Sequence, residues 1–220
     1  TTVAEHMEVL EGLGGLDAIG GPKTDNMYHS AWAWAGDSPF RYTKLIAADW
    51  GGTRTPMVIS WPARIKPDKT PRPQFTHVND VVPTIYEILG IQAPKVVDGH
   101  PQDPIDGTSF VYTFDSPTAP ERKKTQYFDI MGSRGVYQDG WFAAAFGPKK
   151  PWSTDLSGLM NWDPAEDIWE LYDLRKDFSQ AHDLAGEMPK KLRAMKALFT
   201  MQATQNLAFP IGGGLYVPAY

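Results

Sequence analysis

The chain has 220 residues, of which 42% are hydrophobic and 12% are aromatic. That apolar content is enough to fill a packed core and excludes a disordered chain, and no apolar run approaches the roughly 20 residues that a membrane-spanning helix needs. With 21 basic and 26 acidic residues the formal net charge is −5, which argues against a general nucleic-acid binder. The absence of cysteine excludes disulfides, thiolate metal ligands and a cysteine nucleophile within this sequence.

The N-terminal part of the chain is predicted to contain one helix followed by loops. Val3, Met7 and Leu10 recur at helical spacing, and the glycine-rich residues 12–15 that follow are typical of a helix end. Residues 23–36 combine aromatic and small side chains without a regular period, which indicates an ordered loop.

A short helix and then a buried strand are predicted next. Ser38-Pro39 is a helix-start signal, because a serine side chain can cap the first turn and proline fits the first helical position. Residues 40–50 would therefore be helical and would stop at Gly51-Gly52. The apolar run 57–61 lies between two prolines and indicates a strand that is buried on both faces.

A second helix is predicted with clear signals at both ends. Asp80 stands at the N-cap position, Val81 and Ile85 contribute to the apolar face, and Gly90 follows the last turn. The region after it, up to about residue 120, is predicted to be mostly loop.

From residue 125 the pattern changes to short alternating segments. Asp139-Gly140 is a strong two-residue hairpin turn with one predicted strand on each side. Residues 127–130 and 169–174 indicate two further strands, and an amphipathic helix is predicted to open at Pro189. The chain is thus predicted to be α/β up to about residue 120, followed by a small antiparallel four-stranded sheet packed by a long C-terminal helix.

Ordered segments of the sequence resemble the arylsulfatases of the alkaline-phosphatase-like superfamily. The resemblance is carried by Gly20-Gly21-Pro22-Lys23-Thr24, Trp32-Ala33-Trp34-Ala35, Pro39-Phe40, Thr43-Lys44, Gly51-Gly52-Thr53-Arg54, Ile59-Ser60-Trp61-Pro62, Asp80-Val81-Val82-Pro83-Thr84 and Glu170-Leu171-Tyr172-Asp173-Leu174. Any one string is weak, whereas their order and spacing together are specific. The resemblance implies the C-terminal part of an alkaline-phosphatase-like sulfatase fold, with residues 1–120 in the catalytic α/β domain and residues 121–220 in a small subdomain.

The resemblance also implies a reaction, the hydrolysis of sulfuric esters. Members of the family use a formylglycine, made within a Cys/Ser-x-Pro/Ala-x-Arg motif near their N-terminus, beside a calcium ion held by aspartates and an asparagine. The present sequence has no cysteine, and Ser116-Pro117-Thr118-Ala119 lacks the arginine. We therefore expect the nucleophile and the main calcium ligands to lie in an N-terminal portion outside this sequence. The chain alone is expected to hold neither formylglycine nor calcium and to be inactive.

Lys44 is the foremost candidate catalytic residue. The resemblance matches it to a lysine that contacts the sulfate group shortly before a Gly-Gly-x-Arg segment, here residues 51–54. A compact ammonium group suits that role because it offsets negative charge on the sulfuryl oxygens and on the departing phenolate. Asp49 stands where relatives often carry a histidine, a departure that bears on activity or substrate range. As an ordinary residue, Asp49 would be an acid near the C-terminal end of the predicted helix.

Five other polar residues are interpreted separately. His77 is the second candidate catalytic residue, placed either to donate to the substrate or to hold a loop. The Asp25-Asn26 pair has the oxygen donors that calcium prefers, but its flanking residues match a different segment of the family, so no metal ligand is assigned in this chain. Arg54 is expected to tie its turn to an acidic partner or a carbonyl, and Asp80 to serve as a helix cap.

Tryptophan is abundant, with eight residues. Trp32, Trp34 and Trp50 are candidate substrate-binding residues that would wall an aromatic pocket, with ordinary core packing as the alternative. The tryptophans also leave open a non-enzymatic carbohydrate-binding module. A phosphoester hydrolase of the same superfamily, using serine or threonine and metal ions, is the other alternative.

The strand predicted at residues 57–61 has a consequence for partners. In the family such a strand belongs to a large sheet whose other strands lie outside this sequence, so here its apolar face would be exposed. We expect the missing N-terminal portion or a second copy of the chain to cover that face. The substrate would be a sulfate ester, with no nucleic-acid or membrane partner.

Overall fold

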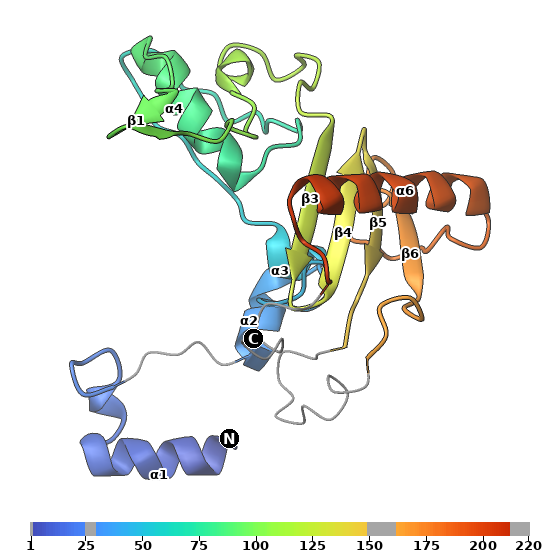
Figure 1. Cartoon of the computed structure of the whole chain (residues 1–220). Coiled ribbons are helices and arrows are strands. Elements are labelled where there is room, and N and C mark those ends of the chain that lie inside the picture. The colour runs from blue at the N-terminus through green and yellow to red at the C-terminus, as the bar shows by residue number, and fades with distance from the viewer. Residues whose placement is uncertain (1, 25–29, 149–161, 212–220) are drawn as a thin grey trace.

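The computed structural model describes residues 2–24, 30–148 and 162–211. Its centre is a four-stranded antiparallel sheet with a long helix across one face (Figure 1). A group of short helices and loops lies beyond one end of this sheet. Among the helices described, none is long and apolar enough to cross a bilayer.

The first helix, α1 (Val3–Leu13), forms where the helical spacing predicts it. Thr2 and Glu5 make a capping box: the Thr2 hydroxyl accepts the Glu5 amide, and the Glu5 carboxylate accepts the Thr2 amide at 2.6 Å. Gly14, with φ 118°, ends the helix in the left-handed conformation. None of the helix residues is buried, so its apolar stripe faces solvent.

The sheet consists of β3 (Thr125–Ile130), β4 (Ser133–Gln138), β5 (Trp141–Ala145) and β6 (Trp169–Asp173), paired antiparallel in that order. It confirms the predicted four-stranded antiparallel sheet. At the turn between β4 and β5, Asp139-Gly140 has positive φ values of 47° and 82°. Positive φ at both central residues is what tight hairpins require, so the Asp-Gly signal acts as predicted.

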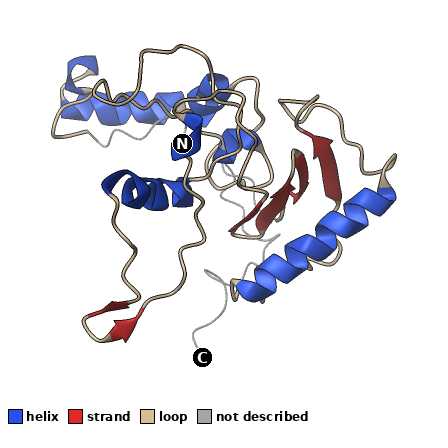
Figure 2. Ribbon diagram, turned by 90° about the horizontal axis from the view of Figure 1, so that it is seen from above, coloured by secondary structure: helices blue, strands red, loops and turns tan. Residues whose placement is uncertain are grey.

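One face of the sheet is covered by helix α6 (Pro189–Gln205), which lies across the strands in Figures 1 and 2. Val136, Ala143 and Leu171 point to this face, because side chains alternate along each strand. The helix residues that are buried against them are Met195, Phe199 and Ala203. The helix begins at Pro189, as proline at the first helical position predicts.

The opposite face of the sheet is covered by a loop. Phe128, Phe142 and Tyr172 from the strands form one core with residues 46–48 and Trp50. Trp50 stacks on Phe142 with ring centroids 4.5 Å apart. This core joins residues from both sides of the predicted boundary at 120/121, and the boundary itself stays a prediction.

Helix α4 (Val81–Leu89) follows a 3₁₀ turn at Val78–Asp80 and ends at Gly90, whose φ is 65°. Both of its ends are where the sequence predicts them. The long loop that follows contains only the two-residue strands β1 (Val96–Val97) and β2 (His100–Pro101) and one short 3₁₀ turn.

Asp80 occupies the predicted N-cap position of α4, but its side chain does not cap that helix. The carboxylate, 1% exposed, instead accepts the amides of His77 and Thr108, each at 2.7 Å, and pairs with Lys123 at 2.7 Å. Because Lys123 lies just before β3, this buried ion pair ties the start of α4 to the sheet. The role predicted for Asp80 is therefore corrected from helix cap to crosslink.

Two predictions between residues 23 and 50 are wrong. Helix α2 (Ser30–Asp37) forms where a loop is predicted, and its alternating alanines have the highest helix propensity of any residue. Residues 40–49 are not helical, and helix α3 (Trp50–Thr53) begins where the predicted helix would end.

The strand predicted at residues 57–61 is also wrong for the described chain. The segment is extended, but it pairs with no strand among the residues that the structure describes. It is exposed rather than buried, and Val58 has 93% of its surface accessible. A strand buried on both faces needs a layer packed on each face, which the described residues do not supply.

Candidate functional site

Lys44 lies on a turn of the segment that follows α2 and includes α3, residues 38–54, which we name the Lys44 loop. Tyr42 and Leu45 on either side of it have positive φ values of 62° and 79°, so the chain turns sharply here. The Lys44 side chain is exposed. In the described part of the chain, neither a hydrogen bond nor an ion pair engages its ammonium group.

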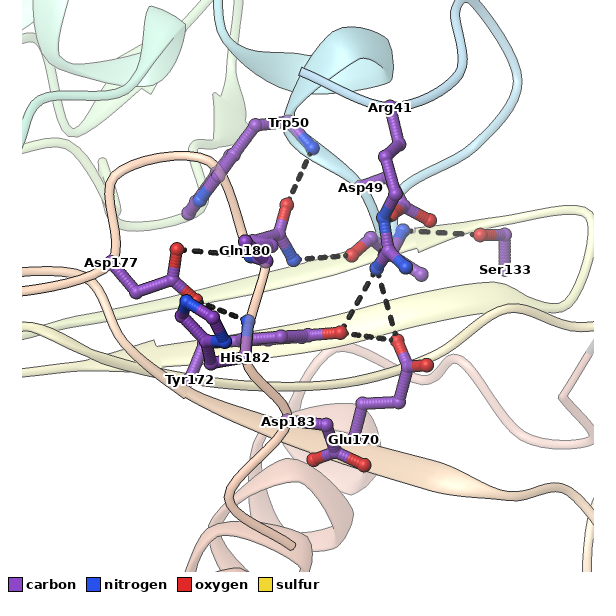
Figure 3. A network of polar contacts seen from close by, with 12 residues as sticks. Arg41, Asp49, Trp50, Ser133, Glu170, Tyr172, Asp177, Gln180, His182 and Asp183 are labelled. Atoms are coloured by element: carbon purple, nitrogen blue, oxygen red, sulfur yellow. Dashed lines mark hydrogen bonds and ion pairs between the residues drawn. The ribbon is translucent and has the colours of Figure 1, made fainter. Parts of the chain in front are cut away.

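The C-terminal half of the Lys44 loop is held by side chains from distant parts of the chain (Figure 3). The Ser133 hydroxyl accepts the Ala48 amide at 3.1 Å. The Gln180 side chain accepts the Trp50 amide at 2.8 Å and donates to the Ala48 carbonyl at 3.0 Å. Gln180 and Ser133 are each 2% exposed. These buried partners satisfy backbone groups that would otherwise need helical bonds, which explains why this segment is not a helix.

Gly51 and Gly52 lie inside α3 rather than after a helix. A Cβ atom at Gly51 would overlap the carbonyl oxygens of Arg41 and Tyr42, and one at Gly52 would overlap the carbonyl of Ile46. The Gly51 amide donates to the Arg41 carbonyl at 3.1 Å. The two glycines therefore allow the helix to pack directly against the backbone of the turn that carries Lys44.

Arg41 connects the same loop to β6 (Figure 3). Its Nη2 atom donates to the Tyr172 hydroxyl at 2.9 Å, and it lies 2.9 Å from Asp49 Oδ1 and 3.3 Å from Glu170 Oε2. The Tyr172 hydroxyl donates to the same Glu170 oxygen at 2.7 Å. Asp49 and Tyr172 are buried, whereas the Arg41 and Glu170 side chains are 40% and 37% exposed.

Asp49 differs from its predicted surroundings. It is the N-cap residue of α3, not an acid at a helix C-terminus, and its side chain makes no capping bond. Burial raises the pKa of Asp49 to about 6; Glu170 acts in the same direction, and Arg41 opposes both. Since Asp49 is 2% exposed, it acts beneath the loop as the partner of Arg41 and does not line the surface beside Lys44.

His77, the second candidate, lies at the start of the turn before α4. Its Nδ1 atom accepts the Asn79 amide at 3.3 Å, and its ring meets the edge of Phe128 with centroids 5.4 Å apart. Burial lowers the pKa of His77, so the ring is mainly neutral at pH 7. No hydrogen bond or ring contact joins His77 to Lys44 among the described residues.

The three candidate tryptophans do not meet in one place. Trp50 is 4% exposed and belongs to the core beneath the Lys44 loop. Trp32 is 68% exposed on α2. Trp34, on the same helix, stacks on Tyr42 of the Lys44 loop with centroids 5.1 Å apart. A role in substrate binding stays a prediction, and it is compatible with the exposure of Trp32 and Trp34 only.

Arg54 ends the Lys44 loop and has a different partner from the one predicted. Its guanidinium carbon lies 4.0 Å from the ring centre of Phe178 and 5.3 Å from that of Phe40. No acidic side chain or carbonyl bonds this guanidinium in the residues that the structure describes. Arg54 is thus held by cation–π contacts.

The described residues do not fit a calcium site. Across residues 2–24, 30–148 and 162–211, no three His, Asp or Glu side chains are grouped to hold a metal ion. Calcium takes about six to eight oxygen ligands, whereas the buried acids Asp49 and Asp80 are each paired with a cation. Asp25-Asn26 lies outside the described residues. Calcium stays a prediction for a longer protein.

The sequence does contain one string with the spacing of the formylglycine motif, Ser60-Trp61-Pro62-Ala63-Arg64. The expectation that the chain lacks such a string is corrected here. This one follows the Lys44 loop rather than lying near the N-terminus. The Arg64 guanidinium makes a bidentate ion pair with Asp115 at 2.8 and 2.6 Å.

Parts of this sequence and structure match known proteins. Residues 4–91 match the sulfatase family model. The sequence is also 28% identical over 189 residues to an uncharacterized sulfatase of Schizosaccharomyces pombe, a match that covers 82% of this chain and 30% of that protein. This chain is therefore similar to sulfatases and carries a match to their family over residues 4–91. It is similar as well to an ulvan-active sulfatase of Formosa agariphila, at 26% identity over 175 residues, 70% of this chain and 34% of that protein.

Two solved structures share the fold of this chain. A Bacteroides thetaiotaomicron chain, BT33336S-sulf, has a TM-score of 0.51 at 20% identity over 72% of this chain and 31% of its own length. The chain of Ps i-CgsB in complex with k-i-k-neocarrahexaose has a TM-score of 0.53 at 19% identity over 76% and 32%. The chain spans about a third of the length of the curated relatives that it matches.

Sequence reasoning missed the side chains that hold the Lys44 loop. Glu170 and Tyr172 occur in a string that carries the resemblance, but nothing near them points to Arg41. Gln180 and Ser133 are separated from Ala48 by 132 and 85 residues. No local pattern signals contacts of this range.

Proposed function

We propose that this chain forms part of a sulfuric ester hydrolase of the arylsulfatase type, in which Lys44 contacts the sulfate group. The observation that carries the proposal is the contrast between Lys44 and its loop. The ammonium group is exposed and unpaired among the described residues, whereas residues 46–50 of the loop are buried and are held by hydrogen bonds to Ser133 of the sheet and to Gln180. The sulfatase family match at residues 4–91 and the similarity to a sulfatase of Schizosaccharomyces pombe support the hydrolase class.

A cation fixed in this way would act on charge that grows during the reaction. Negative charge on the sulfuryl oxygens and the departing phenolate increases toward the transition state, so a positioned ammonium stabilises that state more than the bound substrate. The positioning comes from Arg41, Gln180 and the glycines of α3, which keep the turn from rearranging. We assign Lys44 as the catalytic residue and treat these others as positioning residues.

We propose that a segment outside this sequence supplies the nucleophile and the calcium ion. Formylglycine, when present, provides the covalent nucleophile of sulfate-ester cleavage. Two observations support this: the described acids do not group into a metal site, and the chain spans about a third of its curated relatives. The exposed, unpaired run at residues 57–61 is the proposed place where that segment packs.

The substrate is proposed to be an aryl sulfate or a sulfated polysaccharide. The second class is included because a relative at 26% identity is named an ulvan-active sulfatase. Trp32 and Trp34, exposed on α2 next to the Lys44 loop, are the proposed aromatic contacts for either class.

The test compares hydrolysis of p-nitrophenyl sulfate and p-nitrophenyl phosphate by a polypeptide in which this sequence follows a nucleophile-bearing sulfatase segment. Lys44→Ala should lower kcat on the order of a hundredfold with a smaller effect on KM, because a lost charge donor typically costs that much. Lys66→Ala, at another exposed lysine, is the matched control and should leave kcat unchanged. Wild-type kcat in Lys44→Ala would remove Lys44 from the site, and preference for the phosphate would favour the phosphoester hydrolase.

The source of the nucleophile is tested with the 220-residue chain by itself. It should not turn over p-nitrophenyl sulfate, even when it is produced together with a formylglycine-generating enzyme. Turnover that is lost in Ser60→Ala, with the mass change of a serine oxidised to formylglycine, would show that the chain supplies its own nucleophile.

A further inference from the structure

The first half of α6 carries an unusual concentration of positive charge. The helix has four basic residues and no acidic one, although the whole chain has a net charge of −5. The basic residues are Lys190, Lys191, Arg193 and Lys196. Cations near a helix N-terminus oppose the helix dipole, so this arrangement does not serve the stability of α6.

Two of these cations are held by indole rings instead of carboxylates. Lys191 Nζ lies 5.4 Å from the ring centre of Trp141, and Lys196 Nζ lies 5.6 Å from that of Trp169. A cation–π contact orients the ammonium group but leaves its net charge uncompensated. Trp141 and Trp169 begin β5 and β6, so the sheet fixes the positions of both lysines.

None of the four basic residues of α6 has an ion pair within the described ranges 2–24, 30–148 and 162–211. Other basic side chains at the sheet are neutralised: Arg134 pairs with Asp167 at 2.6 Å, and Arg175 pairs with Asp173 at 2.7 Å. The basic residues of α6 therefore differ from those at the sheet in keeping their positive charge available to an external anion.

The helix geometry spreads these charges along one strip of surface. Met195 faces the sheet, and Lys190 and Arg193 are on the opposite, exposed side, one helical turn apart. Lys196 continues the row after another turn, about 9 Å from Lys190 along the helix axis. A strip of this length can engage several anionic groups of one polymer at the same time.

We propose that this basic strip of α6 binds a sulfated polysaccharide chain. The choice of a sulfated polymer rests on the proposed function, which supplies sulfate esters as the ligand class. Single-stranded nucleic acid is a poorer fit, because it needs aromatic faces for base stacking and cations lie over both Trp141 and Trp169. The strip is on the face of the sheet opposite the Lys44 loop, so it would hold a polymer without contacting that loop.

The experiment titrates the 220-residue chain against fluorescein-labelled dextran sulfate and follows anisotropy at several salt concentrations. The combined variant Lys190→Gln, Arg193→Gln and Lys196→Gln should bind at least about tenfold more weakly, with a flatter dependence of affinity on salt. The control Lys66→Gln, Lys69→Gln and Lys95→Gln removes the same charge from exposed loops and should bind as the wild type does. Circular dichroism verifies that all three proteins are folded.

Equal weakening in the two triple variants would overturn the proposal, because the binding would then follow net charge alone. It would also be overturned if polyuridylate or phosphatidylserine vesicles bound as tightly as dextran sulfate at the same salt. Since no turnover is measured, these outcomes are independent of the Lys44 test. A Lys44 variant with unchanged hydrolysis would refute the proposed function without altering the dextran sulfate result.

Discussion

Oδ1 of Asp49 lies 2.9 Å from Nη2 of Arg41, although Asp49 is 2% exposed and the arginine side chain is 40% exposed. The pair links the buried underside of the Lys44 loop to a cation at the surface. Arg41 also reaches Glu170 and Tyr172, so one guanidinium is shared among three partners. The cluster contains two carboxylates and one guanidinium. Burial removes water from the Asp49 carboxylate, which disfavours its charged form.

Asp49 should make stability depend on pH in the acidic range. Burial raises its pKa to about 6 from 3.8, so between these values the folded chain holds a proton that the unfolded chain has lost. The contribution of Asp49 to the free energy of unfolding should therefore be greatest below about pH 4 and fall as the pH rises through 6, by at most about 3 kcal/mol. Asp49→Asn should flatten this interval in urea titrations. Asp17→Asn, at an exposed position, is the control and should keep the wild-type slope.

Gly52→Ala should destabilise the chain because the added methyl group would overlap the Ile46 carbonyl. An overpacked site of this kind costs about 1–3 kcal/mol. Gly12→Ala is the matched control: it lies in exposed α1 with open space around it, and removing a helical glycine gains about 0.5–1 kcal/mol. Thermal unfolding should thus show shifts of opposite sign. A Gly52→Ala protein as stable as the wild type would mean that the loop and α3 are not closely packed.

Lys123→Met should be far more damaging than Lys124→Met, its neighbour in sequence. Lys123 and Asp80 form an ion pair with side chains 6% and 1% exposed, and removing one partner leaves a buried charge, at a cost of about 3–5 kcal/mol. Lys124 pairs with Asp139, and both side chains are more than half exposed, so little is lost there. Adding Asp80→Asn to Lys123→Met should recover part of the loss in a double-mutant cycle. Equal effects of the two lysine variants would contradict the crosslink.

The isolated chain should self-associate through residues 57–61. Val58 is 93% exposed in a run that pairs with no strand among the described residues, and such a run is a template for pairing with another chain. Val58→Glu should shift sedimentation toward the monomer, because a charge on that run disfavours pairing. Val3→Glu, at another exposed valine on α1, should leave the oligomeric state unchanged. Sedimentation of the wild-type chain as a monomer at high concentration would be inconsistent with this prediction.

Sequence patterns predicted those elements whose signals are local. The Asp139-Gly140 turn, the helix opening at Pro189 and the helix between Asp80 and Gly90 each depend on neighbouring residues, and each is confirmed. The helix predicted at residues 40–50 is wrong because Ser133 and Gln180, which lie far along the chain, form hydrogen bonds to the backbone of the Lys44 loop and determine its conformation.

The candidate site, too, could be predicted only as far as local patterns reach. Lys44 was found through its place in a family pattern, and its exposure could not be derived from composition or spacing. The burial of Asp49 was missed because a helix was expected over residues 40–50, whereas core packing was one of the two interpretations of Trp50. The strand predicted at 57–61 failed for a different reason. Its apolar pattern is local, but the described residues supply no strand or layer to pair with it or cover it.

The hydrogen bonds between Gln180 and the backbone of Ala48 and Trp50 also determine when the Lys44 loop can fold during synthesis. A ribosome must translate another 130 residues after Trp50 before the side chain that fixes it exists. Until then, the Ala48 carbonyl and the Trp50 amide lack this partner, and closing so long a segment is slow compared with forming α1 or α4. A nascent chain arrested before Gln180 should therefore leave the Lys44 loop open to a protease that cannot cut the finished protein.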